Sequence, residues 1–103
     1  NEANVNARNN VGRTPLHWAC FFGRVDAAKL LIHNEANVNA KDNDGDTPLH
    51  YACGFGHVDA TKQLIHNEAN VNARNNVGRT PLHWACFFGR VDAAKLLIHN
   101  EAN

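Results

Sequence analysis

The side chains best suited to chemistry occur as histidine–cysteine pairs. His17 and Cys20 are three residues apart, which places them on one face of an expected helix. The pair recurs at 33-residue intervals as His50 with Cys53 and as His83 with Cys86. A zinc site needs about four converging ligands, whereas equivalent positions on neighbouring helices would lie roughly 8–10 Å apart. We therefore expect structural histidines and cysteines and no metal site.

Other catalytic arrangements are also incomplete. The chain contains no serine, and its Cys–His pairs have no orienting acid in common, so a hydrolytic triad is not expected. The stretch GFGHVD, which begins at Gly54, lacks the third glycine of a phosphate-binding loop, and no strand is expected before it. The sequence therefore predicts a protein that is not an enzyme, with no catalytic residue and no cofactor.

Composition narrows the classes of partner. Ten basic and ten acidic residues balance to a formal net charge of +0, which gives no basic field for nucleic acid. No apolar run is long enough for membrane insertion, and no signal-peptide pattern is found. Three cysteines, an odd count within apolar stretches, predict buried and unbridged thiols. Such thiols predict an intracellular protein, in the cytoplasm or nucleus.

The chain is internally repeated. Residues 1–37 are identical to residues 67–103, and residues 34–66 match residues 1–33 at all but nine positions, so the period is 33. The identity includes surface positions that packing does not constrain. We therefore expect a recently duplicated or engineered array, and the absence of methionine predicts an excised or processed piece.

Local signals divide each unit into two helices and a loop. Thr14 is expected as N-cap and Pro15 as the first residue of a short helix, which Gly23 ends. A second helix follows from about Val25, and the polar stretch NEANVNAKDNDGD, from Asn34, is expected to form an extended turn or hairpin. One unit is too thin to bury its own apolar face, so the copies are expected to stack.

The repeated TPLH-x-A at 14–19, 47–52 and 80–85, followed by G-[RH]-V-D and A-N-V-N-A, resembles the ankyrin repeat over the entire chain. The resemblance implies an all-α repeat solenoid of stacked helix-turn-helix units with projecting β-hairpin loops. It divides the single array 1–103 into a partial hairpin (1–11) and repeats 12–44, 45–77 and 78–103, the last ending after its second helix. The family usually has glycine at the positions of Glu35, Glu68 and Glu101, so Asn34 and its equivalents are alternative candidates for the left-handed turn.

The resemblance also implies a scaffold that binds a protein partner through its loop tips and the ends of its first helices. Carried over residue by residue, the expected contact residues are Val11, Arg13, Trp18, Phe21, Phe22, Asp44, Asp46, Tyr51, Phe55, Val77, Arg79, Trp84, Phe87 and Phe88. Arg13, Asp46 and Arg79 would form a plus–minus–plus row beside the aromatic side chains. The alternative for each phenylalanine is a packing role over the helix ends.

Two further expectations concern modification and self-association. In the family, the asparagine of NVNA bonds turn backbone and is the position that an asparaginyl hydroxylase modifies, which makes Asn39 and Asn72 candidate hydroxylation sites. The terminal repeats lack the usual polar outer face, and the third repeat matches the first. Head-to-tail stacking is therefore expected, and the alternative function is that of a structural array with no native ligand.

Overall fold

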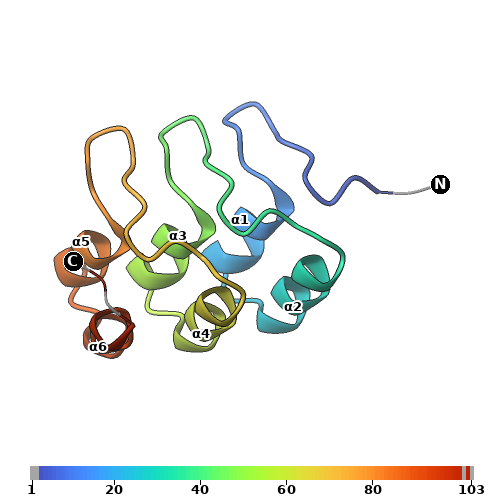
Figure 1. The fold of residues 1–103 in the computed structure, drawn as a ribbon. Coiled ribbons are helices and arrows are strands. Elements are labelled where there is room, and N and C mark those ends of the chain that lie inside the picture. Colours follow the sequence, from blue (N-terminus) through green and yellow to red (C-terminus); the bar gives the residue numbers. More distant parts are fainter. Residues whose placement is uncertain (1–2, 101, 103) are drawn as a thin grey trace.

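The computed structural model describes residues 3–100 and 102, and six helices form in this part of the chain. They are α1 (Pro15–Phe21), α2 (Val25–His33), α3 (Pro48–Gly54), α4 (Val58–His66), α5 (Pro81–Phe87) and α6 (Val91–His99). The first helices of the three units lie side by side in one row, the second helices form a parallel row, and the loops project to one side (Figure 1). The all-α solenoid predicted from the sequence is confirmed.

The projecting loops double back as hairpins do, but their two arms do not pair as β-strands. Each tip is closed by backbone bonds within the loop, such as Asn9 N–H to the Arg13 carbonyl at 3.0 Å. Each pair of neighbouring loops shares one backbone–backbone hydrogen bond, such as Asn43 N–H to the Val11 carbonyl at 2.9 Å, and side-chain bonds add to it. No strand is assigned in residues 3–100, so the expected β-hairpins are hairpin-shaped turns.

The first helix of each unit begins and ends where the sequence predicts. The Thr14 side chain accepts the His17 backbone N–H, and the His17 side chain accepts the Thr14 N–H in return, which satisfies two donors that an α-helix leaves open at its start. Pro15 occupies the first turn, where its missing N–H costs nothing. The helix stops at Phe21, and Gly23 follows with a φ of +68°.

Stacking builds one core from faces that no single unit could bury. Leu16, Leu49, Leu64 and Leu97 are fully buried and lie in a continuous apolar cluster with small residues of both helix rows. The α3 helix packs against α1 on one side and α5 on the other. The middle repeat is therefore covered on both faces, whereas no other unit in residues 3–100 covers the outer face of the first or of the last repeat.

The histidines of the first two TPLH copies, His17 and His50, tie neighbouring loops together. His17 Nε2 donates to the Asp46 carbonyl of the next loop at 2.9 Å, and His50 Nε2 makes the same bond to the Arg79 carbonyl at 2.9 Å. Both rings are buried. The structural role predicted for these histidines is confirmed.

The left-handed turn after α2 and the one after α4 are occupied by glutamate. Glu35 and Glu68 both have a φ of +71°, whereas Asn34 has a φ of −99°. The asparagine alternative was therefore wrong, and the reason is that Asn34 still belongs to the helix end, where its side chain bonds the Leu30 carbonyl. Glu101 lies outside the described residues.

Replacing Glu35 and Glu68 with glycine should stabilise the protein by about 1 kcal/mol per site, because glycine adopts a positive φ without the crowding of a Cβ. Urea denaturation would measure the change in the free energy of unfolding. The matched control is Asn34→Gly, which alters a residue of ordinary φ and should leave the stability unchanged or lower it. The strain argument would be contradicted if the Glu35→Gly and Glu68→Gly variants had no higher free energy of unfolding than this control.

The cysteines are unbridged, but they are not all buried. Cys20 and Cys53 lie in the core, where burial raises the pKa of each thiol to about 12. Cys86, which the repeat pattern also predicts to be buried, is exposed because it faces the open side of the last repeat. The prediction of free thiols is confirmed, and the prediction of uniform burial was wrong at Cys86.

Candidate partner-binding surface

Eight aromatic residues from the three first helices lie along one side of the array, and we call them the aromatic ridge. Within a unit they occupy the i, i+3 and i+4 positions at the end of a helix, which places them on one face. Ring contacts run from unit to unit: the centroids of Phe21 and Phe55 are 4.7 Å apart, and those of Phe55 and Phe88 are 6.2 Å apart. The ridge consists of Trp18, Phe21, Phe22, Tyr51, Phe55, Trp84, Phe87 and Phe88.

Exposure divides the ridge into a surface part and a packing part. Trp18, Phe22, Phe87 and Phe88 have exposed fractions of 40%, 54%, 82% and 45%. The other four members are half-buried or buried: Phe21, Tyr51, Phe55 and Trp84. The two alternatives for the aromatic residues, contact surface or packing, therefore hold for different members of the ridge.

Tyr51 is an expected contact residue that the structure places in the interior. Its exposed fraction is 5%, its hydroxyl donates to the Asp42 carboxylate, and the guanidinium carbon of Arg13 lies 5.5 Å from its ring centroid. Burial, followed by the bond to Asp42, raises the pKa of Tyr51. Tyr51 is therefore a junction residue between the first and second units, out of reach of a partner.

The expected plus–minus–plus row does not form on the surface. Asp46 is buried, with an exposed fraction of 5%, and accepts a bond from Asn75 Nδ2 at 2.9 Å. Burial raises the pKa of Asp46. Arg13 lies 3.6 Å from the Asp42 carboxylate, so only Arg79 of the expected row is exposed. The row fails because position 46 faces the next loop, whose asparagine holds it.

The loop tips provide the remaining expected contact residues. Val11 and Val77 have exposed fractions of 45% and 69%, and Asp44 is also exposed. Asp42, Asp44 and Asp46 bring carboxylate oxygens within 4.8 Å of one another. Asp42 and Asp46 are already bonded to protein side chains, so these carboxylates hold neighbouring loops in place.

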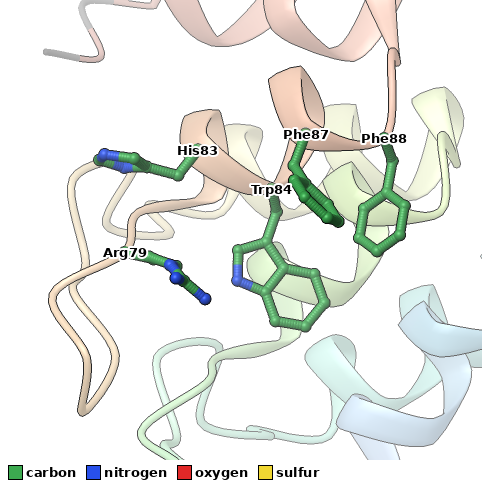
Figure 2. A pocket seen from close by; sticks show the side chains of 5 residues that line it. All are labelled: Arg79, His83, Trp84, Phe87 and Phe88. Carbon is green, nitrogen blue, oxygen red and sulfur yellow. The ribbon is translucent and has the colours of Figure 1, made fainter.

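A pocket of about 390 Å³ lies at the end of the ridge that belongs to the last repeat. It is lined by Arg79, His83, Trp84, Phe87 and Phe88, and Figure 2 shows the Arg79 guanidinium beside the Trp84 indole, with the two phenylalanines on the other side of that ring. His83 was not among the expected contact residues. The signal that could have found it is its place in the last TPLH copy, whose ring has no following loop to bond among residues 3–100.

The asparagines of the two NVNA copies lie at turns between units. Asn39 accepts the Asn70 N–H through Oδ1 at 2.7 Å and donates to the Glu68 carbonyl at 3.4 Å. Asn72 is half-buried, and its backbone N–H donates to Asn70 Oδ1 at 3.0 Å. Asn39 thus bonds turn backbone as the resemblance implies, and hydroxylation at Asn39 and Asn72 stays a prediction.

None of the six helices in the described residues, the longest of which has nine residues, is long and apolar enough to span a bilayer. No curated protein matches the chain at a significant level. Two family models do match: one described as "Ankyrin repeats (3 copies)" covers residues 36–103, and one described as "Ankyrin repeat" covers residues 11–43. Proteins with such repeats are typically non-catalytic and generally act in protein–protein interaction. With its capped first helices, bonded loops and these matches, the chain belongs to the ankyrin-repeat family.

Proposed function

We propose that this chain is a non-catalytic scaffold that binds a protein partner through the exposed part of the aromatic ridge. The observation that carries the proposal is that Trp18, Phe22, Phe87 and Phe88 stay 40–82% exposed although buried positions lie beside them. Clustered exposed aromatic side chains are a common feature of protein-binding sites, because they provide large apolar area at a small cost in side-chain entropy. The family's general role in protein interaction supports the same function.

The shape and charge of the surface define the partner's chemistry. The pocket beside Trp84 is mainly aromatic and accepts an apolar side chain. Arg79 at its edge is exposed and is a donor for a carboxylate of the partner. A partner should therefore present an apolar surface with an acidic group next to it. The free thiols support a site of action in the cytoplasm or nucleus.

Changing Phe22 and Phe88 to alanine together should reduce binding of the partner at least tenfold, because two exposed aromatic contacts are removed. The partner would be isolated from a lysate on the immobilised chain, identified by cross-linking to the ridge, and its affinity then measured by calorimetry. Phe55 is left intact, because its half-buried ring contacts Phe21 of the first unit and Phe88 of the last, and its loss would disturb the packing between units.

The matched control is Ile98→Ala, which removes an apolar side chain that is 60% exposed on α6, away from the ridge. This control should bind as the wild type does. Equal binding by the Phe22/Phe88 variant and the wild type would exclude the ridge as the contact surface. A large loss of stability in that variant would show that the rings belong to the core.

A further inference from the structure

The two junctions between units differ in the aromatic residues that face each other. At the first junction, Phe21 packs on Tyr51, with ring centroids 5.7 Å apart. At the second junction, the phenylalanine position is Gly54, and a Cβ added there would lie 2.5 Å from Cε3 of Trp84. A phenylalanine thus faces the smaller tyrosine ring, whereas the larger indole fits only against glycine.

Polar groups beside these rings alternate in the same way. Asp42 uses Oδ1 to accept two N–H groups of its own loop, and its Oδ2 accepts the Tyr51 hydroxyl and pairs with Arg13 of the preceding unit, 3.6 Å away. Asn75 also uses Oδ1 for two N–H groups of its own loop, so Nδ2 donates to Asp46 of the preceding unit at 2.9 Å. Each junction therefore joins a donor to an acceptor.

Within the described residues, the first and the last unit each have one face that no other unit covers, and these two end faces carry halves of different junctions. The face beyond α5 presents Arg79 and Phe87, which are both exposed. They are equivalent to Arg13 and Phe21, the residues that the first unit contributes to the first junction. The face before α1 presents Asn9 and Trp18, as at the end of the second junction. Joining these two faces would place a phenylalanine where even a Cβ is too close to an indole, and would set an arginine donor against an amide donor.

We infer that the C-terminal end face binds an ankyrin repeat whose leading edge carries an aspartate and a tyrosine at the positions of Asp42 and Tyr51, and rejects a second copy of this chain. The identical outer repeats favour head-to-tail stacking on sequence grounds. The contacts at the junctions argue against it, because two identical repeats lack the pairing of ring size and of donor with acceptor. The partner of this end face is therefore a repeat of the middle type.

Converting the first unit to the middle type tests the inference. The variant Asn9→Asp/Trp18→Tyr/Arg24→His supplies the carboxylate, the smaller ring and the imidazole that at His57 donates to the Phe21 carbonyl at 2.9 Å. Its N-terminal face should then bind the C-terminal face of another copy. This head-to-tail contact need not close into a ring, so further copies can add to either end. In sedimentation velocity the weight-average mass of this variant should rise with concentration, while the wild type stays monomeric.

Adding Phe87→Gly to the triple variant should restore the monomer, because the ring that faces the new tyrosine is lost. The inference would be overturned by a wild type that associates as strongly as the triple variant, or by a folded triple variant that stays monomeric. If the triple variant does not fold, the second junction inside the chain provides another test. Gly54→Phe should lower the urea midpoint, and Trp84→Tyr added to it should raise the midpoint again; a midpoint that stays low overturns the inference equally.

Discussion

Replacing Leu49 with alanine should lower the free energy of unfolding by about 2–5 kcal/mol, the range for large-to-small changes in a closed core. Leu49 has no exposed surface and belongs to the apolar cluster that all three units share. Its helix, α3, contacts the first helices on both sides. Since neighbouring structure is fixed from both directions, the cavity cannot close by relaxation. In a domain of about 5–15 kcal/mol total stability, such a loss removes a large share.

The matched control is the equivalent leucine of the last unit, Leu82. Leu82 is half-buried, because no repeat covers its outer face among the described residues. Leu82→Ala should therefore cost less than Leu49→Ala, although the two residues occupy the same place in TPLH. Urea denaturation of both variants, with the slope checked against the wild type, measures the difference. Equal losses would mean that the outer units are as closely packed as the middle one.

Features that depend on neighbours within a few residues were predictable from the sequence. The helix start at Thr14 and Pro15 and the stop near Gly23 follow from hydrogen-bond donors and φ preferences that act locally, and all three are confirmed. The stacking itself followed from the period of 33, because a unit of that length cannot bury its own apolar face. These signals recur in every unit, so their meaning does not depend on place in the array.

Features that depend on the facing unit were not predictable in the same way. Trp18 and Tyr51 hold the same place in the repeat, yet Trp18 is 40% exposed and Tyr51 is 5% exposed, because only the tyrosine has a unit before it that covers its ring. Cys86 is exposed for the corresponding reason at the other end. Equivalent positions of the repeat therefore share their local structure but differ in burial, which depends on whether a neighbouring unit covers them.

Acid should destabilise this protein through two buried histidines. In His17 and His50, Nε2 carries the proton that is donated to a carbonyl of the next loop. Nδ1 must then accept, since the backbone N–H of Thr14 or Thr47, each 3.0 Å away, can only donate. A second proton on Nδ1 would face that donor. Both rings are thus held in the neutral form.

Burial is the main reason that the pKa of His17 and the pKa of His50 are lowered in the folded chain, and it outweighs the opposite effect of the bond from Nε2 to a carbonyl of the next loop. The unfolded chain, with histidine pKa values of about 6.5, therefore takes up protons first as the pH falls. The stabilisation is complete above about pH 6.5 and declines below it, by at most about 1.4 kcal/mol per pH unit for each histidine.

The raised pKa of Asp46 has the opposite effect, because the folded chain then binds its proton more readily than the unfolded chain does. That effect belongs to the more acidic range of the carboxylates, so the histidine window is about pH 7 to pH 5.

Urea midpoints measured across this window for the wild type and for His17→Gln/His50→Gln should separate the histidines from all other groups. Glutamine at the same helix position still accepts the N-cap N–H, but it does not titrate, and it forfeits the bond from Nε2 to the next loop. The variant should be less stable than the wild type at pH 7, and its midpoint should change little between pH 7 and pH 5. The control is His33→Gln, an exposed position that should retain the wild-type pH dependence. If the double variant lost stability in acid as steeply as the wild type, the buried imidazoles would not be the groups that take up the protons.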